Sequence, residues 1–175
     1  FKITGDAPKD AQLVEITGKQ FNWMMRYPGK DGVFGRKNYR LTDASSGNAL
    51  GVDWEDGSSH DDLESTEMHL VVNKPVQLVI NAQDVIHDVG LPHFRMKMDA
   101  VPGTPTTLWF TPRFTSKQMK EKLNNPDFVY EISCDQMCGK GHWSMRGEII
   151  VESQEEFDAW MAGKKPQYYS ANPEK

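Results

Sequence analysis

Residues Phe128 to Val151 read FVYEISCDQMCGKGHWSMRGEIIV, and this stretch places a ligand-rich loop between two strand-like segments. Phe128–Ile132 and Arg146–Val151 are rich in Val, Ile and aromatic side chains, as β-strands are. The loop between them follows the pattern C-x3-C-x3-H-x2-M, with ligand-capable side chains at Cys134, Cys138, His142 and Met145. This joint spacing, followed directly by a strand, predicts a metal site within a β-rich domain.

Further short segments have a similar composition and are separated by turn residues. The expected strands are Gln12–Thr17, Phe21–Tyr27, Glu67–Val72, Val76–Ala82 and Thr106–Phe110. Turns such as Tyr27-Pro28-Gly29 and Asn73-Lys74-Pro75 lie between them. Helical patterns are short: Ser116–Leu123, and a stretch from Ser153 that opens with a capping box to Glu156. The sequence therefore predicts an all-β sandwich or barrel with short peripheral helices.

The length of 175 residues fits one domain, which we expect over residues 1–163, followed by a polar tail at 164–175. The formal net charge of −5 argues against a nucleic-acid partner. No apolar run approaches the roughly 18 residues that span a bilayer. The first residues, Phe1-Lys2-Ile3-Thr4, resemble no targeting signal, so we expect the chain as given to be soluble.

Negative charge is concentrated between Asp43 and Glu67, a segment that contains eight acidic residues and no Lys or Arg. One interpretation is a solvated loop inserted between strands. The other is a docking surface that attracts a basic partner by its long-range field. The candidate docking residues are Asp53, Glu55, Asp56, Asp61, Asp62 and Glu64.

Thiolate, imidazole and thioether form a soft donor set, which suits copper better than magnesium or calcium. Zinc is a poorer fit, because thioether is not among its usual ligands. Cys138, His142 and Met145 with one distant His would make a blue-copper site, and Cys134 would then be one thiolate too many. Two thiolates can instead bridge two copper ions. The distant imidazole comes from His60, His69, His87 or His93, and spacing alone leaves His87 and His93 even.

Four segments, in this order, resemble the soluble copper A domain of subunit II of haem-copper cytochrome c oxidases. They are GKQFNW at Gly18–Trp23, QDVIHD at Gln83–Asp88, MDAVPG at Met98–Gly103, and the loop Cys134–Met145. The resemblance extends from about Leu13 to Val151. It implies a cupredoxin-like Greek-key β-barrel with a binuclear copper A centre.

The resemblance also implies a ligand set: His87, Cys134, Gln136 through its backbone carbonyl, Cys138, His142 and Met145. The two cysteines would bridge the two copper ions, each histidine would bind one of them, and Met145 would be an axial donor. The family usually has Glu where this chain has Gln136, and that Glu commonly helps to bind magnesium. A neutral amide is a poorer ligand for a hard cation, so we do not predict magnesium.

By the same resemblance, the domain would take single electrons from a c-type cytochrome and pass them to haem in subunit I, where oxygen is reduced. It would be an enzyme only as a subunit of cytochrome c oxidase. Electron uptake is expected near Phe21, where the family often has Trp, and Trp23, although packing within a strand also explains Trp23. The family lies on the outer face of the inner membrane, held by an N-terminal transmembrane hairpin that this sequence lacks.

Three alternatives remain at this point. The copper A domain of nitrous oxide reductase shares the same loop, but Asp99-Ala100-Val101-Pro102-Gly103 and the lack of a large catalytic domain argue against it. A mononuclear blue-copper carrier would leave Cys134 idle. A copper chaperone would use C-x3-C and His, but the strand–helix alternation of a thioredoxin-like fold is absent.

Overall fold

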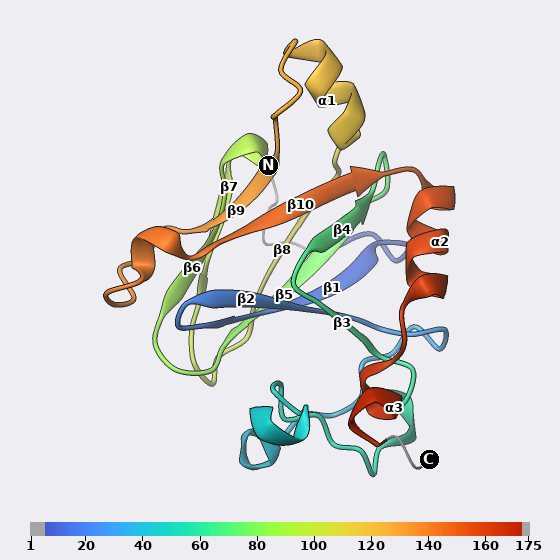
Figure 1. The fold of residues 1–175 in the computed structure, drawn as a ribbon, viewed down its shortest axis with the longest axis vertical. Helices are drawn as coiled ribbons and strands as arrows, with labels where there is room; N and C mark the ends of the chain where they lie inside the picture. The colour runs from blue at the N-terminus through green and yellow to red at the C-terminus, as the bar shows by residue number, and fades with distance from the viewer. Residues whose placement is uncertain (1–5, 173–175) are drawn as a thin grey trace.

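The computed structural model describes residues 6–172, which form two five-stranded β-sheets (Figure 1). The first sheet has the order β3-β2-β1-β5-β8, with β1 at Gln12–Lys19, β2 at Asn22–Tyr27, β3 at Leu63–Ser65, β5 at Val76–Ala82 and β8 at Thr106–Phe110. The second has the order β4-β10-β9-β6-β7, with β4 at Met68–Val71, β6 at His87–Leu91, β7 at Met96–Ala100, β9 at Tyr130–Cys134 and β10 at Arg146–Glu152. The all-β prediction is confirmed. The structure does not describe residues 1–5 and 173–175. These ranges include Phe1-Lys2-Ile3-Thr4, the start of the expected domain and the end of the expected tail.

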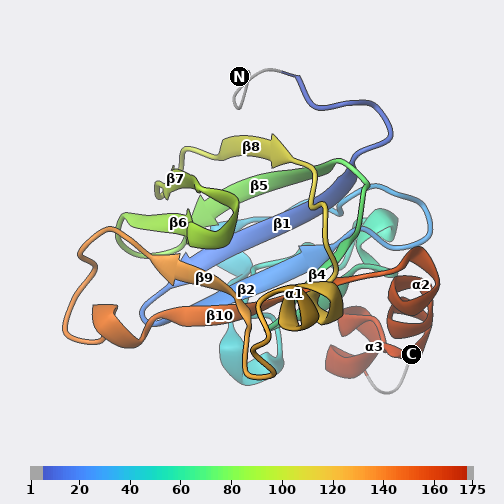
Figure 2. The ribbon, with the colours of Figure 1, turned by 90° about the horizontal axis from the view of Figure 1, so that it is seen from above.

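Alternating apolar residues place the core between the sheets. In the parallel pair of β1 and β5, Val14 lies opposite Leu78 and Ile16 opposite Ile80, and all four side chains are fully buried. Figure 2 shows β8, β5, β1 and β2 side by side in one layer, with β9 and β10 of the other sheet alongside. Apolar residues of both sheets join one buried cluster, which holds the two layers together.

No strand is expected from the sequence between Val76–Ala82 and Thr106–Phe110, and the structure corrects this. The connection contains β6 and β7, and β6 is fully buried although its sequence, HDVGL, includes Asp and Gly, which are weak strand formers. Pairing with β7 and with β9, where Val89 lies opposite Cys134, imposes the strand. His87 therefore begins a central strand next to the strand that ends at Cys134.

Two smaller expectations are also corrected. The strand predicted at Phe128–Ile132 is β9, two residues further along the chain at Tyr130–Cys134. From its sequence, the acidic segment Asp43–Glu67 is expected to be a loop. It contains the strand β3 at Leu63–Ser65, which pairs with β2. Both shifts follow from cross-strand pairing that no local pattern reveals.

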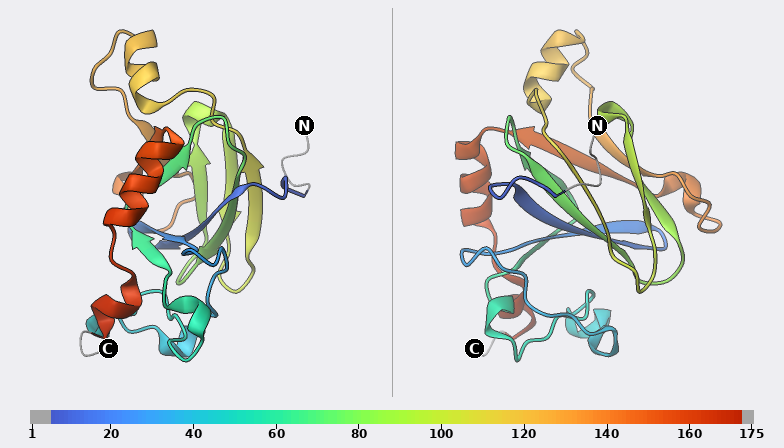
Figure 3. Two further views of the ribbon diagram at one scale, coloured as in Figure 1. Left: turned by 90° about the vertical axis from the view of Figure 1, so that its right-hand side faces the viewer. Right: turned by 180° about the vertical axis from the view of Figure 1, so that it is seen from behind.

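The helices lie at the periphery of the sheets (Figure 3). The two predicted helices are α1 (Ser116–Lys122) and α2 (Gln154–Gly163), and the predicted capping box between Ser153 and Glu156 is present. A third helix, α3 (Gln167–Ala171), lies within the stretch expected as a polar tail. Its Tyr168 is buried and stacks on the His60 ring with centroids 3.8 Å apart, so this stretch packs against the acidic segment. Among the described residues, no helix is long and apolar enough to cross a membrane.

Residues 28–62 connect β2 to β3 and form an insert. A buried cluster of charged side chains, Glu15, Arg26 and Asp62, links this insert to the first sheet. Arg26 of β2 is only 1% exposed. Its guanidinium donates to Glu15 Oε2 on β1 (3.2 Å) and, through Nε, to Asp62 Oδ2 at the end of the insert (3.1 Å). Within the insert, side-chain caps begin short 3-10 helices: Asn38 for η1 (Tyr39–Leu41), Asp43 for η2 (Ala44–Ser46) and Asp56 for η3 (Gly57–Ser59).

Glu64 of β3 lies beside this cluster, and its titration should make the stability of the protein depend on pH. Burial raises the pKa of Glu64 from an ordinary 4.5 to about 7, although Arg26 and Lys37 act in the opposite direction. Between these pH values the native state keeps a proton that the unfolded state has released, so Glu64 lowers stability as the pH rises. We expect Glu64→Gln to be more stable than the parent at pH 8 and to lose that advantage by pH 5, measured by urea unfolding. A difference that does not change with pH would contradict this.

Candidate metal centre

The two cysteine thiols face each other at one end of the second sheet. Both are buried and free, and their Sγ atoms lie 3.7 Å apart, well beyond the roughly 2.05 Å of a disulfide. Cys134 ends β9 and Cys138 follows on the loop, so the rigid sheet fixes the first thiol and the loop carries the second. A metal–thiolate bond is about 2.3 Å for zinc, so a single ion can bond to both sulfurs at this spacing.

His87 completes a cluster with the two thiols. Its Nδ1 lies 3.7 Å from Cys134 Sγ, and the ligand atoms of His87, Cys134 and Cys138 all lie within 4.8 Å of one another. The other ring nitrogen, Nε2, lies 2.8 Å from Oδ1 of Asp84. The carboxylate accepts from Nε2–H, so in the neutral ring Nδ1, which faces the sulfurs, is the nitrogen without a proton; second-shell carboxylates orient metal-binding histidines in this way.

Three more donors come from the loop after Cys134. His142 begins the 3-10 helix η5 (His142–Ser144), and its Nδ1 lies 3.6 Å from Cys138 Sγ. The buried Met145 follows, with its Sδ atom 3.8 Å from the same sulfur. The carbonyl oxygen of Gln136 lies 3.1 Å from Cys134 Sγ. The structure thus brings together all six ligands that the resemblance implied.

Electrostatics around the thiols favour a bound cation. Burial, together with the neighbouring Cys134, raises the pKa of Cys138 to about 11. Burial also acts to raise the pKa of Asp84, but hydrogen bonds from the Gln20 N–H and from His87 hold it below its ordinary range. A site with a charged carboxylate behind one ligand and a protonated thiol at another binds a soft cation by releasing the thiol proton.

The remaining histidines are engaged elsewhere. The His60 ring donates a hydrogen bond from Nε2–H to the Trp54 carbonyl and stacks on Tyr168, while His69 Nδ1 lies 2.8 Å from Glu152. His93, in the 3-10 helix η4 (Pro92–Phe94), accepts a hydrogen bond from the backbone N–H of Glu131. Of the two histidines that spacing left even, the structure groups His87, and not His93, with the two thiols.

The two aromatic residues expected at the site of electron uptake differ in exposure. Phe21 is at the surface, and its ring lies against the metal loop, where a Cβ on Gly141 would be 2.5 Å from it. Trp23 is only 2% exposed, which agrees with the alternative interpretation that it packs within a strand. Its ring meets His87 edge-on at 5.9 Å, and Gly18 leaves space for this contact.

Two other apolar side chains on the metal loop are strongly exposed, and the sequence interpretation did not single them out. Met137 is 72% and Trp143 is 79% exposed. Trp143 also borders a hollow of about 480 Å³ whose lining includes Cys134, His142 and Met145. Large exposed apolar side chains beside a buried site are typical of a surface that a protein partner covers.

The expected docking acids do not form one exposed patch. Asp62 is buried against Arg26, and Asp53 and Asp56 pair with Arg36 at 3.1 and 3.6 Å. Glu55 is exposed and Asp61 is half-buried, whereas Oε1 of Glu64 is buried and without a hydrogen-bond partner among the described residues. The acidic stretch contacts α3 through Trp54 and His60, at the lower right of Figure 1, whereas the orange metal loop lies at the left.

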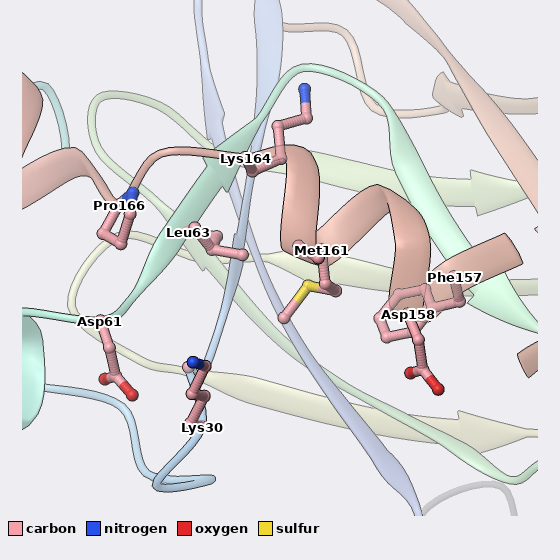
Figure 4. A pocket seen from close by; sticks show the side chains of 10 residues that line it. Lys30, Asp61, Leu63, Phe157, Asp158, Met161, Lys164 and Pro166 are labelled. Carbon is pink, nitrogen blue, oxygen red and sulfur yellow. The ribbon is translucent and has the colours of Figure 1, made fainter. Parts of the chain in front are cut away.

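A second hollow, of about 490 Å³, lies between α2 and the insert (Figure 4). Its lining combines apolar side chains such as Leu63, Phe157 and Met161 with the charged Lys30 and Asp61. None of the six candidate ligands lines it, so this hollow is separate from the metal centre.

Comparison with known proteins agrees with this geometry. A family model described as "Cytochrome C oxidase subunit II, periplasmic domain" matches residues 13–154. The chain belongs to this family. The sequence-based identification of the family is thereby confirmed, and the ligand-bearing segments all fall within the matched range.

Individual relatives support the same family assignment. The alternative cytochrome c oxidase subunit 2 of Bradyrhizobium diazoefficiens is 36% identical over 160 residues, covering 90% of this chain and 53% of that protein. Cytochrome c oxidase subunit 2 of Thermostichus vulcanus is 30% identical over 158 residues, covering 90% of this chain and 34% of that protein. The chain thus spans about half or less of the length of these curated relatives.

The solved structures show the same fold. The periplasmic domain of subunit II of cytochrome oxidase (CoxB) of Bradyrhizobium japonicum matches with a TM-score of 0.61 and 29% identity, covering 92% of this chain and 98% of that one. A mixed disulfide between the thioredoxin-like TlpAs and CoxB matches with a TM-score of 0.55 and 27% identity, covering 90% and 94%. The cupredoxin-like prediction is confirmed.

Sequence interpretation missed two residues that the site depends on. Asp84 holds His87, and its position three residues before the histidine was visible in the quoted QDVIHD segment. Gln20, in the quoted GKQFNW segment, donates its side-chain amide to the carbonyl of Cys138 across 118 positions, a contact that no local spacing indicates.

Proposed function

We propose that this chain is the electron-accepting domain of a haem-copper oxidase, with a binuclear copper A centre held by His87, Cys134, Gln136, Cys138, His142 and Met145. The observation that carries the proposal is the pair of free thiols 3.7 Å apart, each with its own imidazole Nδ1 at 3.6–3.7 Å. A mononuclear blue-copper site uses one thiolate and two imidazoles, so it would leave a buried thiol unused. Two thiolates with two imidazoles supply each of two ions with a nearly equal donor set.

The donor set fits copper. Thiolate, imidazole and thioether are soft or borderline ligands, and Met145 places a thioether where magnesium, calcium or zinc would gain little. When bound, copper would supply a one-electron redox couple. The strands β6 and β9 of this chain fix His87 and Cys134, the loop carries the other donors, and Cys134 and Met145 are kept out of water. Such a site changes shape little when its charge changes, which favours fast electron transfer.

We further propose that electrons come from a c-type cytochrome and leave for haem in subunit I. Met137 and Trp143 are exposed on the metal loop, and the exposed Phe21 lies against it. Together they suit an apolar contact with a protein partner. The exposed Glu55 and the half-buried Asp53, Asp56 and Asp61 would add long-range attraction for a basic cytochrome. Asp62 and Glu64 are too buried to contribute to it. Attachment to the periplasmic face through a membrane anchor belongs to the same proposal.

The test is rapid mixing of the copper-loaded domain with a reduced, basic c-type cytochrome. We expect the cytochrome to be oxidised with a bimolecular rate constant that falls as salt rises, because screening shortens the reach of the acids. Arg36→Ala is expected to raise this rate constant, because it frees the charges of Asp53 and Asp56. A rate constant that is independent of salt would contradict acidic steering, and the absence of any cytochrome oxidation would contradict the proposed electron transfer.

A further inference from the structure

Gln20, in the turn between β1 and β2, contacts both segments that carry the candidate ligands. Its backbone N–H donates to Oδ2 of Asp84 at 2.8 Å, across 64 positions of sequence. Its side-chain Nε2 donates to the carbonyl oxygen of Cys138, across 118 positions. One residue outside the ligand set therefore joins the segment before β6 to the metal loop.

The link through Asp84 reaches His87. The Asp84 carboxylate receives the backbone N–H groups of Gln20 and Val85 at 2.8 Å each, and its Oδ1 lies 2.8 Å from Nε2 of His87. These bonds fix the carboxylate, and the carboxylate fixes the ring and its tautomer. The backbone of Gln20 thus helps to aim His87 Nδ1 at Cys134.

The link through Cys138 reaches the metal loop. Its carbonyl precedes Gly139, whose φ of +136° suits glycine and is rare for other residues. A Cβ at Gly139 would lie 2.8 Å from Nε2 of Gln20, so the turn and the loop are in direct contact. Residues 135–137, 139 and 140 of the loop are exposed, and Asp135 is tied to β6 by its N–H to the Asp88 carbonyl; the Gln20 amide adds a contact from outside the loop at Cys138.

We propose that Gln20 is a positioning residue that holds the His87 segment and the Cys134–Met145 loop in register, so that the copper ligands face one another before the metal binds. The inference rests on the proposed copper site. Without the amide donor, the loop around Cys138 gains conformational freedom that copper binding must then remove. Removing the amide should therefore weaken the retention of copper. It should leave the stability of the barrel unchanged, because Gln20 is exposed and does not enter the core.

The test compares Gln20→Met and Gln20→Glu with the parent chain, all loaded with copper. Both variants keep the backbone N–H to Asp84 and lose the side-chain donor. We expect copper to pass to an excess of chelator about 10-fold faster or more, as for other outer-shell residues of metal sites. The electron paramagnetic resonance hyperfine pattern is expected to change, while the apo variants melt at the temperature of the apo parent.

Two further variants complete the design. Gln154→Met makes the same change on the exposed first turn of α2 and is expected to leave release unchanged. Gln20→Lys keeps a long side chain with a donor, so its release rate should lie closer to that of the parent than to that of Gln20→Met. Fast release in Gln20→Lys equal to that in Gln20→Met would contradict the donor role.

The remaining outcomes separate this inference from the proposed function. A parent chain with a two-copper spectrum, together with Gln20 variants that match its release rate and spectrum, would overturn the inference and leave the copper site standing. Fast release in Gln20→Glu alone would assign the effect to the added charge and also overturn it. A parent chain with no two-copper spectrum would overturn the proposed function, and the inference with it.

Discussion

Cys134→Ser is expected to abolish the binuclear copper signal and to leave at most one copper ion per chain. Cys134 is the buried thiol closest to His87, and its sulfur also faces Cys138 Sγ and the Gln136 carbonyl. A serine hydroxyl is a hard donor with a high pKa, so it cannot replace a bridging thiolate. The change removes one sulfur from both proposed metal positions at once, which makes the effect all-or-none rather than graded.

The measurement is metal analysis together with the optical and electron paramagnetic resonance spectra of the copper-loaded variant. Cys138→Ser is the matched comparison, because both thiols are buried and each faces one imidazole. We expect both variants to lose the two-copper spectrum. A Cys134→Ser variant that keeps the parent's spectrum while Cys138→Ser loses it would identify a mononuclear site with Cys134 idle.

Arg26→Leu is expected to destabilise the chain by about 3–5 kcal/mol, because it leaves buried carboxylates without their counter-charge. Arg26 is 1% exposed and joins Glu15 of β1 to Asp62 at the end of the insert. Burial already raises the pKa of Asp62 even with the guanidinium in place. After the substitution, Lys37 still pairs with Glu15 at 2.7 Å, but Asp62 loses its only cationic partner among the ion pairs of residues 6–172.

The control is Arg36→Leu, which removes an arginine that also contacts two carboxylates, Asp53 and Asp56, but is 71% exposed. Exposed pairs of this kind contribute about 0–1 kcal/mol. Both variants would be unfolded in urea at neutral pH in the metal-free form. Equal losses in the two variants, or a loss below about 1 kcal/mol for Arg26→Leu, would contradict the anchoring role of the buried cluster.

The sequence predicted the strands that alternate cleanly and the loop whose ligands are close together. Val76–Ala82 and Thr106–Phe110 match β5 and β8 residue for residue, since their apolar residues alternate on a half-buried surface. The loop Cys134–Met145 contains two thiols, an imidazole and a thioether within twelve residues. Its candidate side-chain ligands could therefore be named before any fold was known, and the resemblance added His87 and the carbonyl of Gln136.

Other features depend on contacts between distant segments. The sequence of β6, HDVGL, has no strand pattern of its own, and pairing with β7 and β9 makes it a strand. The acidic residues of the insert looked alike in sequence, yet Asp62 is buried with Arg26 and Glu55 is exposed. Trp23 and Phe21 are two residues apart, yet Trp23 lies within β2 and is buried, whereas Phe21 precedes the strand and its exposed ring lies against the metal loop.

Copper stoichiometry, measured with the electron paramagnetic resonance spectrum of the oxidised parent chain, tests the central claim most directly. The proposed centre predicts two copper ions per chain and hyperfine structure from one unpaired electron shared equally by two copper nuclei. One copper ion per chain with a single-nucleus pattern, unchanged when more copper is supplied, would contradict the binuclear site.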